Sequence, residues 1–156
     1  QMLERYPDDV IALHPEAVVL QAGINDLVCG EATGRADLAV RIAATNLRSM
    51  AELALRSGIR PVVMTVVRPR APPLWRRPVM SGRIFASVAD LNTRIRALEG
   101  SGITVIDLDT ALAGADSSTP LHARFGVDTL HWSGAAYGVA NELTLAALRA
   151  RKDAVQ

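Results

Sequence analysis

The 156-residue sequence has few of the features that mark specialised classes of protein. Cys29 is its single cysteine, which excludes an internal disulfide bond and a cysteine-based zinc cluster. No apolar run approaches the roughly 18 residues of a transmembrane helix, so no membrane span is expected. The formal net charge is only +1, and this balance gives no reason to expect nucleic acid or an anionic membrane as a partner.

The composition supports one folded domain. With 49% hydrophobic residues, a chain of this length can bury a sizeable core, and two independent domains are not expected. We therefore predict a single domain over residues 1–156. The opening residues, Gln1 to Arg5, have the character of a helix interior, which predicts that this domain is incomplete at its N-terminal end. The sequence indicates no compartment.

Three short apolar runs predict buried β-strands, at Ala17–Leu20, Pro61–Val67 and Ile103–Asp107. Runs without polar alternation are typical of parallel strands that are covered on both faces. Because parallel strands need crossover helices between them, the pattern predicts an α/β fold with a parallel sheet.

Apolar spacing places helices between and after these strands. Pro7 separates two short helices, at residues 1–6 and 7–13, since proline suits the first turn of a helix. A loop of small residues is expected to run through Gly34. Longer helices are predicted at about 36–57, at 84–98 and after Ser133, a suitable N-cap. The inner stripe of the first long helix is expected to contain Leu38, Ile42, Ala43, Asn46, Met50 and Leu53.

Two polar clusters stand out against this apolar pattern. The first is Gly23-Ile24-Asn25-Asp26, which follows the strand at Ala17–Leu20. Open α/β sheets bind ligands at the carboxyl ends of their strands, so this cluster is expected to deliver polar groups to a pocket.

The second cluster is Asp128-Thr129-Leu130-His131, directly before the last helix. One turn of backbone can bring the Asp128 carboxylate to an imidazole nitrogen of His131. That pairing fixes the tautomer and leaves the other nitrogen free as a general base. The alternative is a loop carboxylate and a half-buried histidine that make ordinary hydrogen bonds.

Together the two clusters resemble the third block, Gly-x-Asn-Asp, and the fifth block, Asp-x-x-His, of the SGNH (GDSL-type) hydrolases. The resemblance covers nearly the whole chain in the right order, and the flanking residues that share it are Gln1-Met2-Leu3-x-Arg5, Asp9-Val10, Pro15-x-x-Val18-Val19-Leu20 and Gly134 to Tyr137. It implies a three-layer α/β/α, flavodoxin-like fold. It also implies ester hydrolysis through a Ser-His-Asp mechanism without metal or cofactor, on small-molecule esters such as acetylated sugars, lipids or aryl esters.

The resemblance assigns a role to each matching residue. His131 is the expected general base and Asp128 its orienting carboxylate. Asn25 is the expected oxyanion donor, through its side-chain NH₂ group. Asp26 is expected to hold the Asn25 loop, and Gly23 to let the backbone turn close to the substrate.

One part of the family pattern is missing. The Gly-Asp-Ser block that carries the nucleophile and the later glycine block do not occur in residues 1–156. We expect both blocks upstream of Gln1, and the chain alone to be inactive or nearly so. A strand partner would be lost with them, exposing the apolar edge of Ala17–Gln21 and lowering solubility. The competing interpretation is a non-catalytic protein of this fold that binds a ligand or a partner.

Several other residues leave two interpretations open. Arg68 and Trp75 lie in a segment rich in arginine and proline, which is either a substrate-facing lid or a solvated loop. One basic loop is too little for nucleic-acid binding. Trp132 either packs the last helix onto the sheet or forms a wall of the pocket. Cys29 is more simply a small loop residue than a replacement nucleophile, and His14 and His122 lack a third ligand for a metal.

Overall fold

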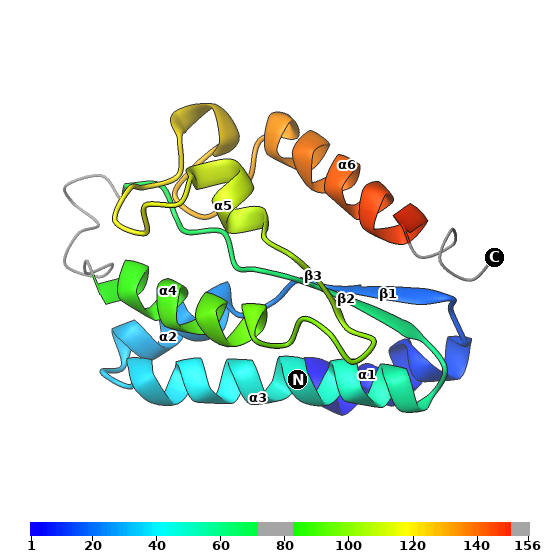
Figure 1. Cartoon of the computed structure of the whole chain (residues 1–156). Coiled ribbons are helices and arrows are strands. Elements are labelled where there is room, and N and C mark those ends of the chain that lie inside the picture. Colours follow the sequence, from blue (N-terminus) through cyan, green and yellow to red (C-terminus); the bar gives the residue numbers. More distant parts are fainter. Residues whose placement is uncertain (72–82, 151–156) are drawn as a thin grey trace.

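The computed structural model describes residues 1–71 and 83–150, which form three layers (Figure 1). The middle layer is a parallel sheet in the order β1-β2-β3, with β1 at Ala17–Leu20, β2 at Arg60–Met64 and β3 at Thr104–Ile106. One face is covered by α1 (Met2–Asp9), α2 (Ile24–Ala32), α3 (Ala36–Arg56) and α4 (Arg83–Arg96), and the other by α5 (Leu108–Ala113) and α6 (Gly134–Ala150). Short 3₁₀ helices occupy Ile11–Leu13 and Ala123–Phe125. The predicted three-layer α/β/α, flavodoxin-like fold is confirmed.

The sheet divides the core into two clusters. Val63 is fully buried towards the α3 and α4 side, and its neighbour Val62 is fully buried towards the α5 and α6 side. Alternate side chains of a strand point to opposite faces, so a central strand with helices on both faces is apolar throughout. β1 pairs only with β2 in the described chain, as expected, and Val19 at this edge is 39% exposed.

β2 ends three residues earlier than predicted because a side chain replaces the sheet partner. The Val66 N–H donates to Asn92 Oδ1 at 2.7 Å, and Asn92 Nδ2 donates to the Val66 carbonyl at 2.9 Å. Asn92 lies on α4 and is fully buried. Its amide therefore satisfies the backbone just beyond the strand, at the carboxyl edge of the sheet.

The two short N-terminal helices were predicted wrongly. α1 continues through Pro7 to Asp9, and a 3₁₀ turn follows at Ile11–Leu13. A proline here removes only one backbone donor, the one that would bond to the Leu3 carbonyl. Burial of Tyr6 holds the helix against the core across that gap.

The predicted loop after Gly23 was also wrong, because residues 24–32 form α2. Leu27 is fully buried in this helix, and Gly30 lies against α3 so closely that a Cβ atom there would come within 2.4 Å of Ala39 Cβ. The small residues that suggested a loop thus serve close helix packing.

α3 has the predicted length to within one residue, but its inner stripe is rotated from the prediction. The buried residues are Val40, Ala43, Leu47, Met50, Ala51 and Ala54. Leu38 and Ile42 were expected inside and are 42% and 47% exposed. The predicted core positions Ile84, Val88, Leu91 and Ile95 of α4 are all buried.

Candidate active site

Asp128 and His131 form a hydrogen-bonded pair immediately before α6. His131 Nδ1 lies 2.7 Å from Asp128 Oδ2, while Asp128 Oδ1 accepts the backbone N–H groups of Leu130 at 2.8 Å and His131 at 2.9 Å. A carboxylate can only accept, so the imidazole proton is on Nδ1. In the neutral imidazole Nε2 is then the nitrogen without a proton, and within the described residues it makes no hydrogen bond.

The local electrostatics keep Asp128 ionised. The backbone N–H groups of His131 and Leu130, followed by the His131 imidazole, hold the pKa of the Asp128 carboxyl well below its usual range. The side chains of His131 and Asp128 are 80% and 53% exposed. The imidazole is therefore both oriented and open to a reacting group.

A closed turn carries this pair, and we refer to residues 126–132 as the His131 loop. Gly126 and Trp132 form an antiparallel bridge, and the Val127 N–H donates to the His131 carbonyl at 2.9 Å. Ser133 then starts α6, since its hydroxyl accepts the Ala136 N–H at 3.4 Å. The sequence prediction of Ser133 as an N-cap is confirmed.

Asn25 and Asp26 lie in the first turn of α2, which begins where β1 delivers the chain to the carboxyl edge of the sheet. Both side chains are exposed, and neither makes a hydrogen bond within the described chain. The Asn25 NH₂ group is therefore free to donate. Asp26 was expected to hold a loop, but it lies in the first turn of α2. A carboxylate at this position is stabilised by the positive end of the helix dipole.

Gly23 precedes α2 with φ of +120° and is buried. A Cβ atom there would lie 2.8 Å from Leu91 Cδ2 and 3.3 Å from Val66 Cγ2. The glycine is thus required by the core and by the backbone turn into α2.

The structure places Asn25 and the Asp128–His131 pair at the same edge of the sheet without a direct contact between them. β1 and β2 are adjacent and parallel, so α2 and the segment after β2 both begin at their carboxyl ends. The His131 loop is fastened to that segment, because the Arg70 N–H donates to the Thr129 carbonyl at 3.0 Å. A cleft of about 280 Å³ beside Asn25 is lined also by Asp26, Asn46, Ala43, Leu47 and Met50.

Arg68 is not placed to contact a substrate, contrary to that sequence interpretation. Its side chain is 3% exposed and binds Asp109 through two hydrogen bonds, Nε to Oδ1 at 3.0 Å and Nη2 to Oδ2 at 2.7 Å. Its remaining bonds go to backbone carbonyls of the loop that follows α5, at Gly114, Asp116 and Thr119. Arg68 therefore ties that loop to the sheet.

Of the two tryptophans, only Trp132 lies within the described residues. Trp132 is half-buried against the cluster that joins α5 and α6 to the sheet, and its ring centre lies 5.4 Å from that of Tyr137. This agrees with its expected packing role. Trp75 lies outside the described residues.

The sequence of the chain matches a known protein family. The model of the GDSL-like lipase/acylhydrolase family matches residues 1–139. The chain belongs to this family. No match was found among curated protein sequences.

Solved structures agree with the membership. A GDSL-like lipase from Bacteroides thetaiotaomicron is 27% identical with a TM-score of 0.72, over 96% of this chain and 69% of its own. A candidate acylhydrolase from Bacteroides fragilis is 27% identical with a TM-score of 0.75, over 96% and 68% of the two chains. A catalytic mutant of an acetylxylan esterase from Geobacillus stearothermophilus shares the fold at 19% identity, with a TM-score of 0.57, over 92% and 64%.

The serine hydroxyls and the thiol that the structure describes in this GDSL-like chain are not bonded to His131. In residues 1–71 and 83–150 no serine hydroxyl and no thiol is hydrogen-bonded to His131; Ser87 Oγ donates to Glu31, Ser118 Oγ to Asp116 and Ser133 Oγ to Arg124. Cys29 is exposed on α2. The same ranges contain no group of three His, Cys, Asp or Glu side chains suited to a metal ion, and no helix long and apolar enough to cross a membrane.

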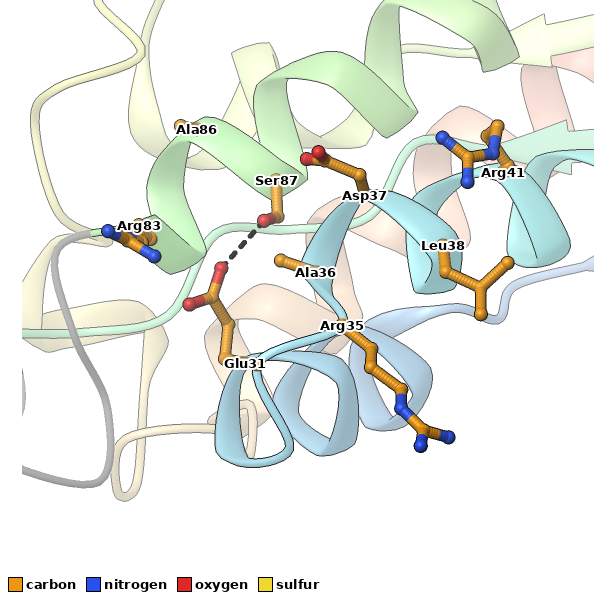
Figure 2. Close-up of a pocket in the computed structure, with 10 residues that line it drawn as sticks. Glu31, Arg35, Ala36, Asp37, Leu38, Arg41, Arg83, Ala86 and Ser87 are labelled. Carbon is orange, nitrogen blue, oxygen red and sulfur yellow. Dashed lines mark hydrogen bonds between the residues drawn. The ribbon is translucent and has the colours of Figure 1, made fainter.

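A larger cleft lies apart from these residues. It measures about 500 Å³ between the end of α2, the start of α3 and the start of α4 (Figure 2). Ser87 donates to Glu31 across it at 2.8 Å, while Arg35, Arg41 and Arg83 point in different directions. None of the predicted site residues lines it.

Sequence reasoning missed three residues that hold the candidate site of this family member in place. Asn92 caps the end of β2, Asp109 neutralises Arg68, and Arg70 binds the His131 loop. Asn92 did carry a signal, being a polar residue on the apolar face of a predicted helix. Asp109 and Arg70 gave none, since charged residues are usually solvated.

Proposed function

We propose that this chain supplies the general base, its orienting carboxylate and an oxyanion donor of a serine ester hydrolase. The observation that carries the proposal is the Asp128–His131 pair in a member of the GDSL-like family. Nδ1 is held by a carboxylate that stays ionised, and Nε2 is exposed and unbonded. That state is what a base needs to accept a hydroxyl proton.

The proposed reaction follows acyl transfer in two steps. A serine hydroxyl gives its proton to His131 Nε2 while its oxygen attacks the ester carbonyl. The developing oxyanion accepts a hydrogen bond from the Asn25 NH₂ group, which makes no other hydrogen bond in the described chain. His131 returns the proton to the departing alcohol, and a water molecule, deprotonated in the same way, releases the acid.

We propose that the nucleophilic serine lies upstream of Gln1. The Gly-Asp-Ser block is absent from residues 1–156, and the chain matches 69% and 68% of the two Bacteroides structures. On this proposal residues 1–156 form one incomplete domain. Gly23 and Asp26 act as supports, through the turn into α2 and through its first turn.

The proposed substrate is a small-molecule ester, such as an acetylated sugar, a lipid or an aryl ester, without a cofactor. The cleft beside Asn25 is lined by both apolar and polar residues. The apolar ones include Met2, Leu3, Ala43, Leu47 and Met50, and the polar ones are Gln1, Asn25, Asp26 and Asn46. Sites of this make-up suit a compact ligand with an apolar part and a carbonyl.

Hydrolysis of p-nitrophenyl acetate by the protein in its full coding length tests the proposal. We expect His131→Ala to lower kcat by about 10⁴-fold or more, and Asn25→Ala by about 10²- to 10³-fold. His14→Asn and Asn141→Ala, which change an exposed histidine and an exposed amide, are the matched controls. Undiminished activity in both site variants would remove the assignment, and a wild type inactive on every ester tried would favour the non-catalytic interpretation.

A further inference from the structure

Arg70 binds the His131 loop at two points. Its backbone N–H donates to the Thr129 carbonyl at 3.0 Å, and its Nη1 donates to the Gly126 carbonyl at 3.1 Å. Gly126 and Thr129 stand on either side of Asp128 in the chain. One residue therefore fixes the backbone both before and after the carboxylate that orients His131.

Gly126 gives this contact its shape. A Cβ atom at this position would lie 2.3 Å from Arg70 Cδ, 2.9 Å from Arg70 Cγ and 3.1 Å from the Asp128 carbonyl oxygen. The backbone itself, with φ of −120°, is one that any residue adopts. Glycine is thus needed here for space and not for conformation. The stem of Arg70 lies across the loop at the one residue that has no side chain to obstruct it.

The backbone that leads into Arg70 is itself held in place. Arg68, two residues earlier, is buried in its pair with Asp109, and the Pro69 carbonyl accepts the Leu121 N–H at 3.2 Å. Arg70 therefore extends from backbone that is tied to the sheet layer. A buried network of this kind resists rearrangement, since each of its polar groups would lose a partner.

Within the His131 loop, Gly126 and Thr129 are buried, but the reacting pair itself is not held by burial. The side chains of His131 and Asp128 are mostly exposed, and Val127 is 70% exposed. A small displacement of the loop would move the imidazole relative to a hydroxyl, and misplacement by about 1 Å costs on the order of 10²-fold in rate.

We infer that Arg70 is a positioning residue, which sets the place and orientation of the Asp128–His131 pair by clamping the loop at Gly126 and Thr129. It acts through the loop backbone and touches neither reacting group. This inference rests on the proposed function for its effect on rate. Its effect on the geometry of His131 does not depend on that function.

The test uses Arg70→Met in the full-length protein, because methionine keeps an apolar stem and removes the guanidinium donor. We expect kcat to fall about 10- to 100-fold with KM little changed, and the His131 amide, bonded to Asp128, to exchange faster with solvent. Imidazole ¹⁵N shifts should move away from the Nδ1–H tautomer. Gly126→Ala should have the same effects, by displacing the Arg70 stem and by crowding the Asp128 carbonyl. Arg70→Lys should recover part of the kcat lost in Arg70→Met, because lysine offers an N–H donor to the Gly126 carbonyl. Arg48→Met, an exposed arginine on α3, is the matched control.

The outcomes separate the two claims. Unchanged amide exchange, tautomer and kcat in folded Arg70→Met and Gly126→Ala would overturn the positioning role. Should Arg70→Met fail to fold, Gly126→Ala and Arg70→Lys decide by the same readouts. If no form of the protein hydrolyses esters but the exchange and the tautomer still respond, the proposed function fails and the positioning role stands.

Discussion

Asp109 and Asp128 make nearly the same set of hydrogen bonds in opposite surroundings. Asp109 accepts three hydrogen bonds from Arg68, one from its backbone N–H at 2.9 Å and two from its guanidinium group. Asp128 accepts two backbone N–H groups and one imidazole nitrogen. The Asp109 side chain is 5% exposed and that of Asp128 is 53% exposed.

The two pairs differ in whether the partner of the aspartate, Arg68 or His131, keeps a nitrogen that is free to bind another group. Arg68 spends its other donors on the Gly114, Asp116 and Thr119 carbonyls, so the buried cluster closes on itself and can only stabilise the fold. His131 keeps Nε2 for a further group. Burial and a complete set of partners thus mark a structural ion pair, whereas exposure and one unused nitrogen mark a site that can react.

The largest effect on stability is expected on the buried side of this comparison. Asp109→Asn leaves the Arg68 charge buried without its counter-charge, which should lower the free energy of unfolding by about 3–5 kcal/mol. Urea denaturation measures this change. Asp128→Asn should cost much less by the same measurement, because both charges of that pair face water.

A double variant tests whether the loss of stability comes from the unpaired charge of Arg68. Arg68→Met with Asp109→Leu removes both buried charges and should recover part of the loss. If Asp128→Asn proved as destabilising as Asp109→Asn, the division between a structural pair and a reactive pair would be wrong.

A smaller effect concerns the titration of Asp128. Its pKa is lowered chiefly by backbone N–H groups, so the carboxyl should stay ionised as the pH falls through about 3.9, the ordinary value for aspartate. The stability that this group contributes is fully present above that pH and is lost progressively as the pH falls from there through the lower folded pKa. ¹³C NMR of the carboxyl carbon follows this directly.

The variant His131→Ala separates the two causes of the lowered Asp128 pKa, the backbone N–H groups and the imidazole. The pKa of Asp128 should remain low in this variant, since the largest contributions are backbone bonds that an alanine also makes. A return to the ordinary value would assign the shift to the imidazole instead.

The sequence predicted the alternation of strands and helices well because buried parallel strands are apolar throughout. β1 has the predicted bounds, and α3 ends one residue before the predicted end. The phase of α3 was missed because the helix carries a second apolar row at Leu38 and Ile42, and only the packing of α2 and α4 decides which row is buried. α2 was missed because Asn25, Asp26 and Gly30 have low intrinsic helix propensity, which the packing of the helix overrides.

The candidate site shows a similar division. The spacing of Asp128 and His131 allowed their pairing, because one turn of backbone joins them, and the resemblance to the family favoured it over separate loop hydrogen bonds. The structure contains the pair. The buried role of Arg68 depends on Asp109, which lies in α5 after β3 and 41 residues further along the chain, so no local pattern links the two. Long-range partners of charged residues follow from the tertiary fold alone.

The central claim is that the Asp128–His131 pair activates a serine outside residues 1–156. The most direct measurement is mass spectrometry of the full-length protein after reaction with a fluorophosphonate. The account predicts one labelled serine, N-terminal to Gln1, and loss of the label in His131→Ala. A label on a serine within residues 1–156, or ester hydrolysis with no labelled serine, would contradict it.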